Sequence, residues 1–88
     1  MVNAIVLLKV QRERLNDVAR ALNAVDGVSE VYYVAGQWDL VAMLRASDDD
    51  QFAAIITEGM LRIEGIKASE TLIAFQALSR FDLEKLFS

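Results

Sequence analysis

A chain of 88 residues with no histidine, no cysteine and a formal net charge of −4 has room for one small domain and lacks the commonest catalytic and transition-metal-binding side chains. Its acidity and scattered basic residues argue against independent binding to nucleic acid, and no apolar run approaches the roughly 20 residues of a membrane-spanning helix. The first residues lack the basic region and cleavage site of a signal peptide, so we expect a cytoplasmic protein without cofactors or disulfides.

The apolar content of the chain is high for its length. Hydrophobic residues make up 55% of the sequence, whereas an average soluble protein has roughly 45–50%. One small core does not need this much apolar material, and a large apolar surface on a monomer promotes aggregation. We therefore expect a homodimer or a larger homo-oligomer whose interface buries the surplus.

The first half of the chain shows a strand, a helix and a second strand. Residues 4–10 are rich in β-branched and long aliphatic side chains, which predicts a strand. Residues 12–25 predict an amphipathic helix, because four apolar residues recur at the spacing of one helix face: Leu15, Val18, Ala19 and Leu22. The pair Asp26-Gly27 then predicts a turn that ends the helix, and residues 28–35 predict the second strand.

The second half begins with a strand predicted at residues 38–45 and continues with a helix. We expect Ser47 to be the N-cap of this helix, with Asp48, Asp49 and Asp50 in the first turn, where carboxylates meet the positive end of the helix dipole. A metal site is the alternative for this acidic run, and the absence of a nearby histidine or cysteine favours capping. The expected buried face consists of four apolar residues: Phe52, Ile55, Ile56 and Met60.

The two halves repeat one plan, and residues 66–77 complete it as the fourth predicted strand. The positions Val18, Leu22, Val25, Gly27 and Val28 recur in the second half as Ile56, Met60, Ile63, Gly65 and Ile66. This β-α-β-β-α-β order predicts a ferredoxin-like α+β fold, in which both helices cover one face of a four-stranded antiparallel sheet.

The uncovered face of such a sheet should alternate between apolar and polar residues if it meets water. Residues 4–8 and 40–44 do not alternate, because both stretches are apolar throughout. We therefore expect two sheets to pack face to face as a dimeric α/β barrel, with strand order 4-1-3-2 in each subunit. Residues 1–78 would form this oligomerisation domain, and residues 79–88 a short helical tail that docks on a neighbour through Phe81, Leu83, Leu86 and Phe87.

The most informative stretch is the turn between the second and third predicted strands, Gly36-Gln37-Trp38-Asp39. Neighbouring strand residues point to opposite faces, so Trp38 and Asp39 cannot both lie in the core. An aspartate beside an apolar strand loses hydration unless a partner replaces it. That partner is either a ligand ammonium or the backbone amides of a turn in which Gly36 has a positive φ and Trp38 packs on the partner subunit. The residues alone favour the amides.

The pattern Gly-x-aromatic-Asp-Leu at residues 36–40, the repeated half-domain and the apolar stretch 71–75 together resemble the effector-binding domain of the Lrp/AsnC family of transcription regulators. The resemblance covers about residues 1–77. It implies dimers formed through the sheet faces, assembly of dimers into octamers, and amino-acid effectors bound at subunit interfaces near the glycine turn. The full regulators of this family carry a helix-turn-helix domain, so this chain resembles the effector-binding domain alone.

The resemblance makes one segment the expected effector-binding site: Gly36, Gln37, Trp38 and Asp39. Weaker candidates are Val34, Leu40, Glu70 and Thr71. Trp38 stands where tyrosine is common in the family. The implied function is non-catalytic binding of an amino acid that modulates assembly or a partner regulator, such as a full-length Lrp/AsnC protein.

Two other functions remain open on the sequence. Small dimeric α/β barrels include monooxygenases and isomerases, and a site of that kind would need the hydroxyl of Tyr32 or Tyr33 inside the barrel. The chain also fits an assembly module that binds no ligand.

Overall fold

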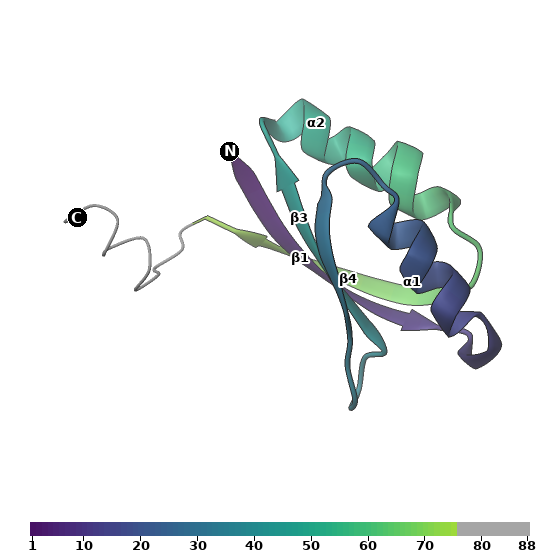
Figure 1. The fold of residues 1–88 in the computed structure, drawn as a ribbon. Helices are drawn as coiled ribbons and strands as arrows, with labels where there is room; N and C mark the ends of the chain where they lie inside the picture. Colours follow the sequence, from purple (N-terminus) through teal and green to yellow (C-terminus); the bar gives the residue numbers. More distant parts are fainter. Residues whose placement is uncertain (76–88) are drawn as a thin grey trace, which may run out of the picture.

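The computed structural model describes residues 1–75, so the predicted tail at residues 79–88 and the last residues of the predicted fourth strand lie outside the described part. Figure 1 shows the arrangement of the elements. In chain order they are β1 (Val2–Val10), η1 (Arg12–Arg14), α1 (Leu15–Asn23), β2 (Val28–Tyr33), β3 (Leu40–Ala46), α2 (Asp49–Ala54), η2 (Ile55–Gly59), η3 (Met60–Arg62) and β4 (Ile66–Ala74). No helix within residues 1–75 has the length and apolar character needed to cross a membrane.

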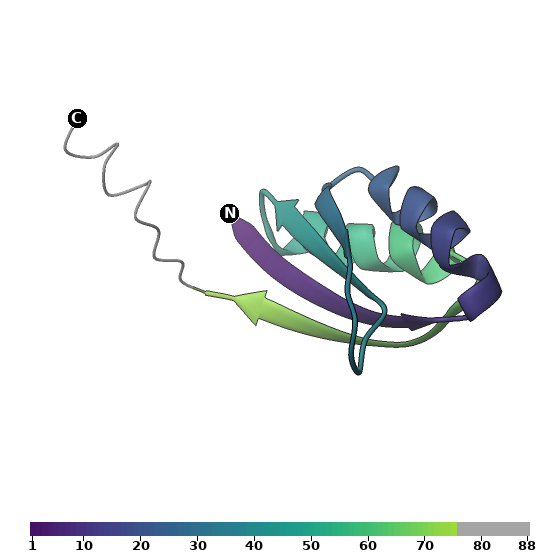
Figure 2. The same ribbon diagram turned by 60° about the horizontal axis from the view of Figure 1, so that its bottom comes forward.

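The four strands form one antiparallel sheet in the order β2-β3-β1-β4, which confirms the predicted strand order and the ferredoxin-like α+β fold. The long central strands β1 and β3 pair in continuous register from Val2 with Ala46 to Leu8 with Leu40. Strand β4 pairs along the other edge of β1, with a register shift between Lys9 and Val10. Both helices lie on one face of this sheet, and Figure 2 shows the opposite face without any covering element.

The core lies between the sheet and the helices. Alternate residues of the two central strands point toward the helices, because side chains in a strand alternate between faces. Those of β1 and β3 are Ala4, Val6, Leu8, Val10, Leu40, Ala42, Leu44 and Ala46, and all eight are buried. The helices contribute Val18, Ala19, Leu22, Ile55 and Met60 to the same cluster. Burial of each leucine-sized side chain contributes about 1.5–3 kcal/mol, so this layer supplies most of the apolar stabilisation of the monomer.

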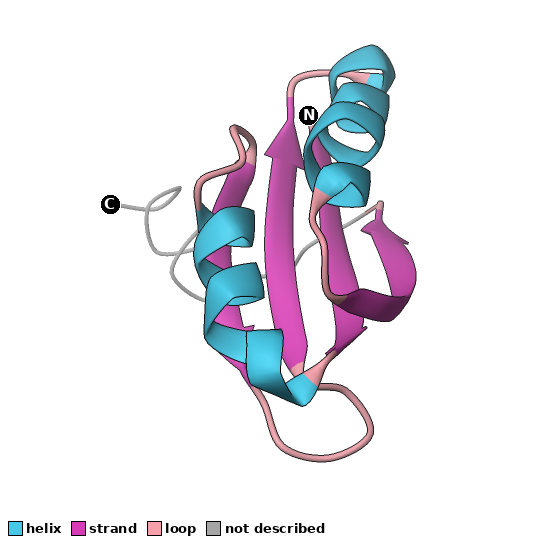
Figure 3. Ribbon diagram, turned by 90° about the vertical axis from the view of Figure 1, so that its right-hand side faces the viewer, coloured by secondary structure: helices cyan, strands magenta, loops and turns pink. Residues whose placement is uncertain are grey.

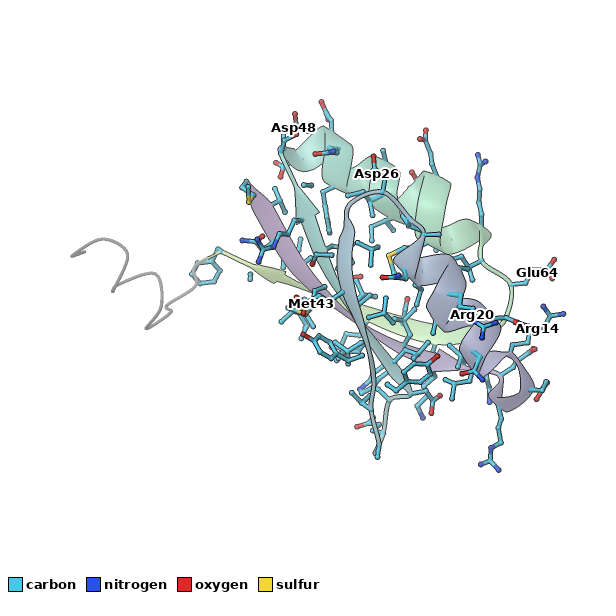
Figure 4. The ribbon with its side chains drawn as sticks, viewed as in Figure 1. Arg14, Arg20, Asp26, Met43, Asp48 and Glu64 are labelled. Carbon is cyan, nitrogen blue, oxygen red and sulfur yellow. The ribbon has the colours of Figure 1, made fainter. Side chains whose placement is uncertain are left out.

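The other residues of the same strands point to the uncovered face, and most of them are apolar too. The register places Ile5 and Leu7 of β1 beside Met43 and Val41 of β3, with Leu72 of β4 next to Ile5. We call these five residues the open apolar face. The first four are only partly buried and Leu72 is 45% exposed, and Figure 4 shows Met43 on the side of the sheet away from the helices. Strands with two apolar faces were expected from the lack of alternation in the sequence, and the structure confirms them.

The second helix differs from its prediction at the start. Its N-cap is Asp48 rather than Ser47, because the Asp48 carboxylate accepts a hydrogen bond of 2.8 Å from the Gln51 amide. Ser47 instead donates its hydroxyl to the Gln51 side chain at 2.7 Å. An aspartate adds negative charge at the positive end of the helix dipole, which a serine cannot do. Across residues 1–75, no three acidic, histidine or cysteine side chains gather closely enough to hold a metal ion.

The turns that follow the two helices are equivalent and confirm the internal repeat. Gly27 and Gly65 have φ angles of 101° and 105°, a region that only glycine enters freely. A side chain at either position would also crowd a helix: a Cβ at Gly27 would lie 2.2 Å from the end of the Ile55 side chain, and a Cβ at Gly65 would lie 3.0 Å from the side chain of Val18. The turn of each half therefore packs against the helix of the other half.

Candidate functional site

The hairpin between β2 and β3 lies at the end of the sheet where the first helix begins, and Figure 3 shows its loop reaching beyond the strands. The amide of Val34 donates to the carbonyl oxygen of Asp39 at 3.1 Å, which closes the loop. Gly36 has a φ of 126°, as expected for the glycine of this turn. No atom outside its chain neighbours lies within 4 Å of a Cβ built at Gly36, so open space adjoins the turn.

Asp39 connects the hairpin to strand β1 through both its backbone and its side chain. Its amide donates to the carbonyl oxygen of Leu8 at 2.8 Å, and its Oδ2 accepts a hydrogen bond of 3.0 Å from the Val10 amide. The partly buried carboxylate thus accepts a hydrogen bond from a backbone amide. That amide belongs to the neighbouring strand β1, whereas the sequence favoured amides of the turn itself.

A hollow of about 370 Å³ opens beside this hairpin, and we call it the hairpin hollow. Its lining comes from the turn, the end of β1, the start of the first helical segment and the start of β4. The lining residues are Lys9, Val10, Arg12, Leu15, Gly36, Gln37, Asp39 and Lys67. The volume lies within the roughly 300–1,000 Å³ of small-molecule sites.

The hairpin hollow carries side chains of both charges. Lys9, Arg12 and Lys67 are exposed cations from three different elements, and Asp39 is the carboxylate among them. Ammonium and guanidinium groups bind carboxylates by charge-assisted hydrogen bonds, and an aspartate binds an ammonium in the same way. The arrangement therefore suits a small molecule that itself carries separate positive and negative groups.

Some of the residues expected to bind an effector line the hairpin hollow, and others do not. Gly36, Gln37 and Asp39 line the hairpin hollow. Trp38 is half-buried next to them, and Val34 is exposed on the strand side of the loop. The weaker candidate Leu40 is wholly buried in the core, where it packs beneath the helices.

The other two weaker candidates lie on opposite faces of β4. Glu70 pairs with Leu7 and so projects from the uncovered face, whereas Thr71 pairs with Val6 and projects toward the helices. Thr71 lines a separate, mainly apolar hollow of about 130 Å³ between β4 and the second helix. Neither residue lines the hairpin hollow.

Sequence reasoning missed the cationic part of the site, namely Lys9, Arg12 and Lys67. The predicted strand order could have revealed these cations. In this antiparallel order the end of the first strand meets the start of the fourth strand on one side and the start of the third strand, where the hairpin ends, on the other. Lys9 and Lys67 stand at the first two of these positions, so the predicted topology already places them near Gly36.

The two tyrosines do not line an enclosed cavity in the described part of the chain. The hydroxyl of Tyr32 donates to the carboxylate of Glu30 on the same strand, and the side chain is 48% exposed. The hydroxyl of Tyr33 donates to Oδ1 of Asn16 at 3.0 Å, and its side chain is 57% exposed. Both hydroxyls are therefore held by acceptors at the surface of the subunit.

These features define a class of protein: a ferredoxin-like α+β domain with one bare sheet face and a charged hollow beside a glycine hairpin. The sequence matches the Lrp/AsnC ligand binding domain over residues 3–82, and the chain belongs to the Lrp/AsnC family. The resemblance seen in the hairpin motif is thus confirmed over nearly the whole chain.

Comparison with individual proteins agrees with this assignment. An uncharacterized HTH-type transcriptional regulator of Pyrococcus horikoshii is 35% identical over 65 residues, which are 74% of this chain and 41% of that regulator. The chain thus spans less than half the length of this relative. The crystal structure of TTHA0845 from Thermus thermophilus has a TM-score of 0.84 at 38% identity, covering 91% of this chain and 100% of that chain.

A more distant structure is a transcriptional regulator of Neisseria meningitidis in complex with L-methionine. Its TM-score is 0.78 at 12% identity, over 90% of this chain and 53% of that chain. At this identity the likeness shows the shared fold alone.

Proposed function

We propose that this chain binds an amino-acid effector at the hairpin hollow, without catalysis, and that binding modulates its assembly or a partner transcription regulator. The observation that carries the proposal is the presence of Asp39 and three cations around one hollow of suitable volume. An amino acid carries an ammonium group and a carboxylate on one carbon, and this lining offers a partner to each. Membership of a family with a ligand-binding domain and a relative named as a transcriptional regulator support the regulatory part.

The assembly part of the proposal rests on the open apolar face. Pairing of two subunits through this face would remove Ile5, Leu7 and Met43 from water, each of which is partly exposed in one subunit. The Oδ1 atom of Asn3, at the edge of the same face, is buried and has no hydrogen-bond partner within the described residues. An unpaired buried acceptor costs about 1–3 kcal/mol, which a donor from a second subunit would recover.

The ligand part is tested by titration of each of the twenty amino acids while the fluorescence of Trp38, the single tryptophan of the chain, and the melting temperature are followed. A ligand at 100 times its dissociation constant stabilises the folded state by roughly 2.7 kcal/mol, and each kcal/mol raises the melting temperature of a domain this size by about 4–8 °C. We expect a few amino acids to give both signals. A flat response to all twenty would favour a ligand-free assembly module or an enzyme.

The role of Asp39 is tested with the variant Asp39→Asn. The amide oxygen of asparagine can still accept from the Val10 amide, whereas the negative charge that would bind an ammonium is lost. We expect this variant to fold with a melting temperature close to that of the parent chain and to bind the amino acid at least about tenfold more weakly. Unchanged affinity in Asp39→Asn would contradict the assigned role of the carboxylate.

A further inference from the structure

The hairpin hollow holds an excess of positive charge in a chain that is acidic overall. Residues 1–75 contain seven lysines and arginines, and three of them line this one hollow: Lys9, Arg12 and Lys67. The whole chain has a formal net charge of −4. Like charges repel, so gathering cations in one place lowers stability unless an anion joins them.

None of these three cations forms an ion pair within the described part of the chain. The ion pair found within residues 1–75 joins Arg14 to Glu64 at 3.7 Å, outside the lining of the hollow, and Figure 4 shows the two side chains near one another. Asp39 is the single carboxylate of the lining, so one negative charge stands against three positive charges there. The excess positive charge of the hollow is therefore left for a bound anion.

We propose that the effector is an amino acid with an acidic side chain, so that it brings two carboxylates and one ammonium to the hollow. This inference rests on the proposed function. In that geometry Asp39 binds the ammonium and one cation binds the α-carboxylate. The remaining two cations bind the side-chain carboxylate. A neutral or basic side chain would leave these two cations without a partner.

The experiment compares L-glutamate and L-aspartate with their neutral amides, L-glutamine and L-asparagine, at constant ionic strength. The readouts are Trp38 fluorescence and melting temperature. An exposed ion pair contributes up to about 1 kcal/mol, which is about a fivefold change in affinity, so two cations on the second carboxylate give an expected preference of about tenfold or more for the acidic amino acids. Added potassium chloride should weaken glutamate binding more than glutamine binding, because salt screens charges.

Substitution of single cations tests which of them bind the side-chain carboxylate of the ligand. Of the variants Lys9→Gln, Arg12→Gln and Lys67→Gln, two should weaken the binding of the acidic amino acid about fivefold with little effect on that of its amide, and the third should weaken the binding of both. The matched control is Arg62→Gln, an exposed arginine on η3 that does not line the hollow. This control should keep the full preference.

The possible outcomes separate this inference from the proposed function. Selective binding of a neutral amino acid, with no preference for glutamate or aspartate, would overturn the acidic effector and leave the proposed function standing. Binding of succinate or inorganic phosphate as tightly as of glutamate would overturn both, because neither anion carries an ammonium. If Lys67→Gln changes the oligomeric state and leaves glutamate affinity unchanged, the cations serve contacts between subunits and the inference fails.

Discussion

We expect the carboxylate of Asp39 to have two roles, one in the fold and one in ligand binding. Its Oδ2 accepts the Val10 amide where strand β1 shifts register against β4, and its position in the hairpin hollow makes it the expected partner of a ligand ammonium. The sequence could show that this aspartate needs a partner, because it stands between two apolar strands. It could not show which partner, since Val10 lies 29 residues away and becomes a neighbour only when the sheet has formed.

The contribution of Asp39 to the free energy of unfolding can be measured separately from its role in ligand binding. Asp39→Ala removes the acceptor of the Val10 amide and should lower the free energy of unfolding by about 1 kcal/mol, or the melting temperature by about 4–8 °C. Asp39→Asn retains an acceptor and should lose much less stability. Thermal unfolding without ligand tests the comparison, and equal losses in both variants would mean that the charge, rather than the hydrogen bond, stabilises the strand end.

Tyr32 gives a prediction for alkaline pH. The hydrogen bond to Glu30 and the negative charge of that carboxylate raise the pKa of the Tyr32 hydroxyl above its ordinary value of 10.0. Because the pKa is raised in the folded state, the contribution of this hydrogen bond to stability is fully present below pH 10.0 and is lost as the pH rises through the raised pKa. An ultraviolet titration of tyrosinate should resolve one tyrosine that ionises late, and Glu30→Gln should bring it back toward the ordinary value. A late transition that persists in Glu30→Gln would exclude Glu30 as its cause.

At the scale of the elements, the second helix shows how far a pattern in the sequence predicts the structure. The apolar residues Phe52, Ile55, Ile56 and Met60 were all expected on the buried face. Ile55 and Met60 are fully buried, and Phe52 and Ile56 are partly buried and pack against the same core. Ile55 and Met60 lie five residues apart, and the segment η2 between them is a π-helix, whose wider turn brings positions five apart onto one face. A regular helical period could not predict this widened turn. The pattern predicted the inward face of the helix correctly, but not the widened turn within it.

The start of the same helix offers a direct test of its cap. Asp48→Ala removes the side chain that accepts the Gln51 amide and should lower the free energy of unfolding by about 1 kcal/mol. Asp50→Ala is the matched control, since Asp50 lies in the first turn without being the N-cap and should cost only a few tenths of a kcal/mol. Urea denaturation of both variants measures the difference. A larger loss in Asp50→Ala would contradict the assignment of Asp48 as the cap.

At the scale of the whole molecule, the open apolar face predicts the oligomeric state. We expect the protein to sediment as a dimer or larger species at micromolar concentration. Met43→Lys places a charge in the middle of this face and should shift the protein toward monomers, because an unpaired charge resists burial. Asn23→Lys adds the same charge at the exposed end of α1 and should leave assembly unchanged. A monomeric parent chain at micromolar concentration would overturn this prediction.

The fold was more predictable from the sequence than the site. The sheet order and the two-faced apolar strands follow from residue patterns that repeat along each element, so errors at single residues hardly affect them. The hairpin hollow instead depends on a few long side chains from the ends of different elements. The sequence identified Gly36, Gln37 and Asp39 through a local motif, whereas Lys9 and Lys67 become part of the site only through strand pairing.

The hairpin hollow is made of three stretches that are far apart in the chain: the end of β1 with the helical segment that follows it, the hairpin, and the start of β4. A partly unfolded molecule that has lost either the β1–β3 or the β1–β4 pairing has no such hollow and cannot hold the effector there. Effector binding should therefore slow amide hydrogen exchange in all four strands together, including β2, which contributes no residue to the lining. Occupancy of this small surface site is thus coupled to the opening of the entire sheet.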